Sequence, residues 1–68
     1  MAKLTLRAAR VNAGYTQKTA ATLLNVSNKT LGSWESGDRY PNAVKIMDIC
    51  KLYNMSYDDI IFLPSNPL

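Results

Sequence analysis

Residues that begin and end helices recur along the whole chain and divide it into short segments. Side chains of the kinds that cap helix N-termini precede each segment: Thr5, Thr16, Ser27, Asn42 and Ser56. Glycine or asparagine, which tolerate a left-handed backbone, stand at most of the segment ends: Gly14, Asn25, Gly37 and Asn54. The pattern predicts short helices over residues 6–13, 17–24, 28–36, 43–53 and 57–62, and it predicts no pair of strands.

The length and composition bound the kind of protein that these segments form. The 68 residues are enough for one small domain, and a hydrophobic fraction of 47% argues against disorder. No apolar stretch approaches the roughly 18 residues of a membrane span. The N-terminal residues 1–4 lead into a polar segment without a hydrophobic signal region. We therefore expect a single domain over residues 1–68, in the cytoplasm and without membrane contact.

The residue types that most metal sites and many active sites need are scarce. Histidine is absent and Cys50 is the one cysteine, which excludes a zinc site and an internal disulfide. Asp58 and Asp59 suit a helix start and have no third ligand nearby. With no phosphate-binding glycine loop and no activated nucleophile, we expect no enzyme, no cofactor and no small-molecule ligand. Cys50, Met47 and Met55 are interpreted as packing residues.

The charges are distributed unevenly along the chain. The net charge is +3, and residues 1–45 hold all but one of the Lys and Arg residues with only Glu35 and Asp38 as acids. The remaining residues, 46–68, are slightly acidic. A basic front of this kind favours contact with a polyanion. The alternative is an ordinary solvated surface.

Residues 17–36 predict two short helices joined by a tight turn. Asn25 stands in the turn. The inward positions of the two helices are apolar: Ala21, Val26, Leu31 and Trp34. A small residue such as Ala21 suits the point where the two helices cross, and Leu31 and Trp34 would anchor the second of them to the core. This spacing is typical of a helix-turn-helix.

The outward face of the segment 28–36 is polar and small. At 100° per residue its members are Asn28, Lys29, Gly32, Ser33 and Ser36. Glycine inside a helix costs roughly 1 kcal/mol relative to alanine. One interpretation is that Gly32 lets this helix approach the floor of a nucleic-acid groove. The other is an exposed polar face on which the glycine has no function.

The sequence resembles the phage repressor and Cro-like helix-turn-helix proteins, also called the XRE family, over roughly residues 4–61. The matching elements are Arg10, Gly14-Tyr15-Thr16-Gln17, Ala21, Asn25-Val26-Ser27, Trp34-Glu35-Ser36-Gly37, Pro41 and Asn54-Met55-Ser56-Tyr57-Asp58-Asp59-Ile60. The resemblance implies an all-α, compact five-helix lambda-repressor-like domain. It also implies that the third helix, within the helix-turn-helix core 17–36, enters the major groove of double-stranded DNA.

The resemblance assigns roles to individual residues. Three would read base edges: Asn28, Lys29 and Ser33. Five would contact the DNA backbone: Gln17, Thr16, Ser27, Ser36 and Arg39. Gln17 would also brace residue 28, and Arg10 and Glu35 would form an ion pair between the first and third helices. Asp38 departs from the family pattern, since it places an acid beside the expected phosphate path and next to Arg39.

We expect a Cro-like or minimal repressor that binds a pseudo-palindromic operator as a homodimer. The dimer would form through the C-terminal segment 57–64, which contains Ile60, Ile61, Phe62 and Leu63; Ser56 and Asp59 have the spacing of a capping box there. The alternative for this segment is that it folds back over the protomer's own core. The alternative function is a protein-interaction module on the same fold, such as an antitoxin-like partner.

Overall fold

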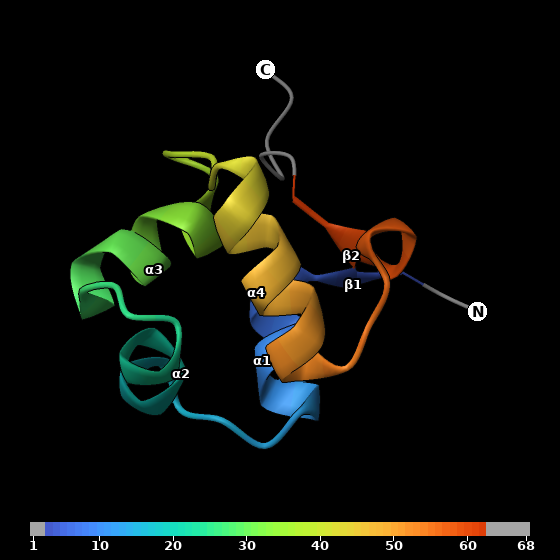
Figure 1. Cartoon of the computed structure of the whole chain (residues 1–68), viewed down its shortest axis with the longest axis horizontal. Coiled ribbons are helices and arrows are strands. Elements are labelled where there is room, and N and C mark those ends of the chain that lie inside the picture. The colour runs from blue at the N-terminus through green and yellow to red at the C-terminus, as the bar shows by residue number, and fades with distance from the viewer. Residues whose placement is uncertain (1–2, 63–68) are drawn as a thin grey trace.

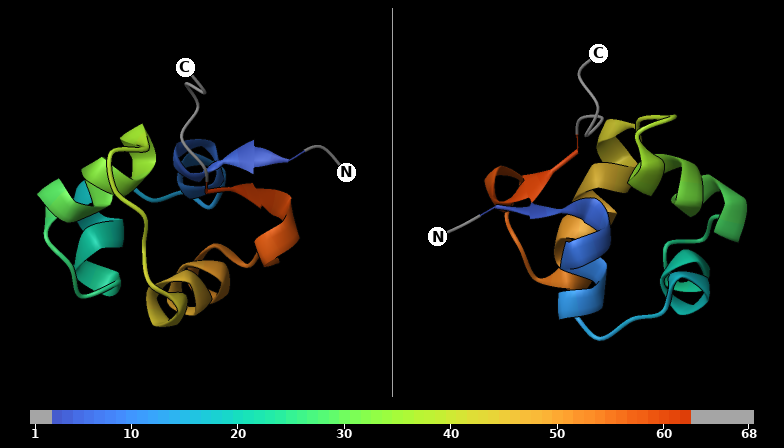
Figure 2. Two further views of the ribbon diagram at one scale, coloured as in Figure 1. Left: turned by 90° about the horizontal axis from the view of Figure 1, so that it is seen from above. Right: turned by 180° about the vertical axis from the view of Figure 1, so that it is seen from behind.

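The computed structural model describes residues 3–62 and is built mainly from four α-helices. They are α1 (Leu6–Asn12), α2 (Gln17–Leu23), α3 (Asn28–Ser36) and α4 (Ala43–Tyr53). A 3-10 turn over Tyr57–Asp59 follows, and the strands β1 (Leu4–Thr5) and β2 (Ile60–Ile61) pair in parallel. Figure 1 shows α2 and α3 on one side of α1 and α4, with the small sheet on the other side, and both views of Figure 2 agree.

The predicted starts and ends of the first four helices are confirmed to within about one residue. Each N-cap oxygen accepts a hydrogen bond from the backbone N–H three residues later, at Ala8, Thr19, Thr30 and Lys45. The chain turns left-handed where glycine or asparagine was expected to stop each helix: Gly14, Asn25, Gly37 and Asn54. These boundaries are local, so the residues beside them suffice to determine them.

The predicted fifth helix is present only as the 3-10 turn over Tyr57–Asp59, and its continuation over residues 60–62 is wrong, as is the expectation that no strands pair. The Ser56 side chain makes no cap hydrogen bond, and its hydroxyl donates to the Asp59 carboxylate at 2.9 Å. The backbone becomes extended at Ile60, which pairs with Leu4 in β1. The two strands therefore supply the backbone hydrogen bonds that another helical turn would have made, and β-branched isoleucine suits this conformation.

The hydrophobic core lies between the helices and takes in part of the C-terminal segment. Ile60 and Phe62 are each only 5% exposed, whereas Ile61 is 40% exposed. Within the described residues the segment therefore folds back over the protomer's own core, which was the alternative interpretation. Leu63 lies outside the described residues.

The expectations for the sulfur-containing side chains hold in part. Cys50 and Met55 pack against the core, but Met47 is exposed and its assignment as a packing residue is wrong. Within residues 3–62 no three potential metal ligands lie together. None of the described helices has the length and hydropathy that a membrane crossing needs.

Tyr53 carries a buried hydroxyl that the sequence does not reveal as unusual. The residue is 3% exposed, and its Oη has no hydrogen-bond partner among the described residues. Its ring lies near that of Tyr15, with the centroids 6.2 Å apart. Burial, reinforced by the Glu35 carboxylate, raises the pKa of Tyr53 from 10.0 to about 12.

Tyr53→Phe should raise the free energy of unfolding at pH 7 by about 1 kcal/mol, because it removes a buried polar group that has no partner. The raised pKa means that the folded wild type loses stability as the pH rises from about 10 to about 12. Tyr53→Phe has no hydroxyl to ionise at this position, so it should not show this loss of stability at high pH. Urea unfolding of both proteins at pH 7 and above pH 10 measures the two effects. A destabilised variant would mean that the hydroxyl has a partner, such as a buried water.

Candidate nucleic-acid interface

The turn between α2 and α3 is tight because a few small contacts close it. Asn25 adopts a left-handed backbone with φ of 60°, and the Val26 N–H donates to the Ala21 carbonyl at 2.9 Å. Below the turn, Leu31 is fully buried and Trp34 nearly so. These contacts fix α3 against α2 and leave the opposite face of α3 exposed to solvent.

The outer face of α3 presents two kinds of polar side chain. Asn28 and Lys29 are exposed and make no side-chain hydrogen bond within residues 3–62. Ser33 and Ser36 instead donate their hydroxyl protons back into the helix, to Thr30 O at 2.7 Å and Ser33 O at 3.1 Å. The serines therefore lie close to the helix surface and offer only acceptor oxygens, whereas Asn28 and Lys29 extend with free donors.

Thr16 and Ser27 are the N-caps of α2 and α3. The Thr16 hydroxyl accepts from the Thr19 N–H at 3.1 Å, and the Ser27 hydroxyl accepts from the Thr30 N–H at 3.0 Å. Both hydroxyls are thus engaged in the protein itself. A contact with a phosphate at these positions would come chiefly from the free backbone amides of the first helical turns.

Arg10, Glu35 and Gln17 form one connected group that joins three helices. Arg10 Nε lies 2.7 Å from Glu35 Oε2, and Arg10 Nη1 donates to the Tyr15 carbonyl at 2.8 Å. Gln17 Nε2 donates to Glu35 Oε1 at 3.1 Å. The Arg10 and Glu35 side chains are only 8% and 5% exposed. The Gln17 amide is directed at Glu35, and the bracing of Asn28 that the resemblance implied is not formed.

A polar hollow of about 720 Å³ lies between α3 and the loop that follows it, lined by Lys29, Thr30, Ser33, Trp34, Asp38, Arg39 and Tyr40. The loop is held against the end of α3, since the backbone N–H groups of Asp38 and Arg39 both donate to Ser33 O. Among the described residues, Arg10–Glu35 is the only ion pair within 4.0 Å. Asp38 therefore does not engage Arg39, and two cations face the same hollow.

Three tertiary contacts near this surface were not predicted. Lys45 Nζ donates to Leu24 O at 2.8 Å and so ties α4 to the end of α2. One of the cations counted in the basic front is thus used inside the protein. The Tyr40 and Tyr57 hydroxyls lie 3.1 Å apart, and the Tyr57 ring stacks on Phe62 with centroids 5.3 Å apart. This contact joins the loop after α3 to the C-terminal segment.

The geometry of α2, the turn and α3 agrees with the comparison to known families. The family model described as helix-turn-helix matches residues 6–60. The chain belongs to the XRE-like helix-turn-helix family. The matched residues include all four α-helices and the 3-10 turn, so membership rests on the domain as a whole.

Three relatives of this helix-turn-helix chain come from Bacillus subtilis (strain 168). The HTH-type transcriptional regulator ImmR is 41% identical over 56 residues, which are 82% of this chain but only 44% of ImmR. The uncharacterized HTH-type transcriptional regulator YazB is 40% identical over 55 residues, covering 81% of this chain and 80% of YazB. A third, YgzD, also an uncharacterized HTH-type transcriptional regulator, is 30% identical over 54 residues. The chain thus spans less than half the length of ImmR and most of YazB.

Proposed function

We propose that this chain is a transcriptional regulator that binds double-stranded DNA sequence-specifically, without a cofactor or a catalytic step. The observation that carries the proposal is the outer face of α3, which presents polar side chains and one glycine on a helix that the turn and the buried Trp34 hold in place. The names of the curated relatives support the same function.

The proposed contacts divide into two classes with different consequences. Base edges in the major groove would be read by Asn28 and Lys29, because amides and ammonium groups match base donors and acceptors there. Ser33 would read a base amino group, because its hydroxyl oxygen is free to accept a hydrogen bond. The DNA backbone would be held by Arg39, by Gln17 and by the amides at the capped starts of α2 and α3. Ser36 would join them by turning its hydroxyl proton from Ser33 O to a phosphate oxygen. Backbone contacts supply affinity and register, and base contacts supply sequence preference.

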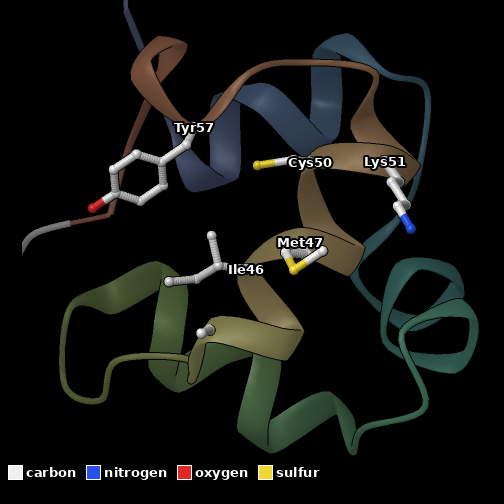
Figure 3. Close-up of a pocket in the computed structure, with 6 residues that line it drawn as sticks. Ile46, Met47, Cys50, Lys51 and Tyr57 are labelled. Atoms are coloured by element: carbon white, nitrogen blue, oxygen red, sulfur yellow. The ribbon is translucent and has the colours of Figure 1, made fainter.

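We also propose a Cro-like mode of binding, in which two protomers occupy a pseudo-palindromic operator. Each chain offers one recognition helix, so a two-fold pair doubles the number of base contacts. Ile60 and Phe62 are buried, which leaves the exposed Tyr57 and Ile61 of the C-terminal segment for such a contact. Beside Tyr57, an apolar hollow of about 570 Å³ is lined by Ala43, Ile46, Met47, Cys50, Lys51 and Tyr57 (Figure 3).

Selection of bound duplexes from random DNA tests the function and the binding mode together. We expect one enriched motif with two related half-sites about 10 base pairs apart, protected together in a footprint. Its affinity should fall steeply with salt, because bound phosphates release counterions. Sedimentation of the complex should give two protomers per duplex.

Two results would contradict parts of this proposal. A single protected half-site with one protomer would exclude the paired mode and leave the regulator function intact. Binding that depends on neither salt nor sequence would contradict the function itself. It would favour the protein-interaction module as the alternative.

A further inference from the structure

Gly32 lies inside α3, where no contact among residues 3–62 requires a glycine. The backbone there is helical, unlike that of the left-handed Gly14 and Gly37. Among the described residues, the atoms nearest to a Cβ at position 32 would be those of the Gln17 carboxamide, at 3.6–3.9 Å, which is ordinary van der Waals contact. Alanine therefore fits, and it is the better helix former. The packing of the described residues therefore does not explain why position 32 is a glycine.

The surroundings of Gly32 form a notch in the outer face of α3. Asn28 and Ser36 lie one turn before and one turn after it on the same face. The Gln17 carboxamide lies beside the glycine and is held there by its hydrogen bond to Glu35. One amide proton is used in that bond. Within residues 3–62 the second proton and Gln17 Oε1 have no protein partner, so the side of the notch is polar and fixed in place.

We propose that Gly32 determines how deeply α3 enters the major groove, because its missing side chain leaves the notch in which a base edge lies beside the Gln17 carboxamide. This inference rests on the proposed function. It assigns to position 32 a steric role and not a hydrogen-bonding one: a single methyl group there keeps α3 away from the bases. Asn28 and Lys29, on the same face, then reach their partners less well.

Gly32→Ala tests the notch directly, since the variant should fold better and bind worse. We expect the Tm to rise by about 4–8 °C, as the gain in helix propensity implies for a domain of this size. The affinity for the selected duplex should fall at least tenfold. Thr22→Ala is the matched control, because it adds a strong helix former at an exposed site on α2 and should leave the affinity unchanged.

The Gly32→Ala substitution, repeated in a Gln17→Ala background, distinguishes two ways in which the methyl group could lower the affinity. If it occupies the notch, Gly32→Ala still lowers the affinity at least tenfold when Gln17 is absent. If the loss disappears there, the methyl acts by displacing Gln17 and the proposal is overturned. It is also overturned if Gly32→Ala binds as tightly as the wild type. A wild type that binds no duplex refutes the proposed function instead.

Discussion

Glu35→Ala should lower the free energy of unfolding by about 3–5 kcal/mol, the usual effect of removing one partner from a buried ion pair. Arg10 would keep its charge in a site that is almost closed to solvent, with only the Tyr15 carbonyl still accepting from it. The Gln17 amide would lose its acceptor as well. Arg10→Ala should be comparably destabilising, because it leaves the carboxylate buried with only the Gln17 amide.

A double-mutant cycle measured by urea unfolding decides whether this pair acts as a unit. The double variant should lose clearly less stability than the sum of the two single variants, because each single change leaves the other charge unpaired. Asp58→Ala removes an exposed acid and serves as the control, with an expected change within about 0.5 kcal/mol. Additive losses would show that the two residues do not couple energetically.

Lys29→Met and Arg39→Ala should weaken DNA binding in two different ways, although both side chains line the same hollow. Lys29 lies on the outer face of α3, so its loss should relax base preference at one position in each half-site. The expected loss is about 1–3 kcal/mol where the partner is guanine. Arg39 lies in the loop, so its loss should weaken binding to all sequences equally and reduce the salt slope by about one.

Affinities for the operator and its single-base variants, measured at several salt concentrations, distinguish these effects. Arg7→Ala removes a cation from the exposed side of α1 and should alter neither base preference nor salt slope substantially. If Arg39→Ala changed base preference while Lys29→Met changed only the salt slope, the proposed assignment of Lys29 to the bases and Arg39 to the DNA backbone would be wrong.

The parts of the fold that follow from local chemistry could be predicted from the sequence. Thr5, Thr16, Ser27 and Asn42 cap the helices that they precede, because a cap requires only an oxygen and the amides that follow it. The β1–β2 pairing could not be predicted in this way. It joins Leu4 to Ile60, and a two-residue strand has too short a pattern to reveal its partner.

The candidate site shows the same division between local and tertiary information. Helical periodicity places Asn28, Lys29 and Ser33 on one face without any knowledge of the fold. Tertiary packing determines the direction of the Gln17 amide and the use of Lys45 as a cap on α2. The lack of a hydrogen-bond partner for the Tyr53 hydroxyl among the described residues also results from tertiary packing, because an exposed tyrosine would bond to water.

The parallel contact between β1 and β2 also bears on the order in which the chain folds. It brings together residues close to the two ends of the described chain. It therefore closes the longest loop within residues 3–62, and its formation has the largest cost in loop-closure entropy. The contacts between α2 and α3 join residues that are close in sequence, so their formation costs little loop-closure entropy. We therefore expect the helix-turn-helix to become structured first and the strand pair to close last. The same entropy makes this pair the first contact to open in a native-state fluctuation, while α3 stays folded.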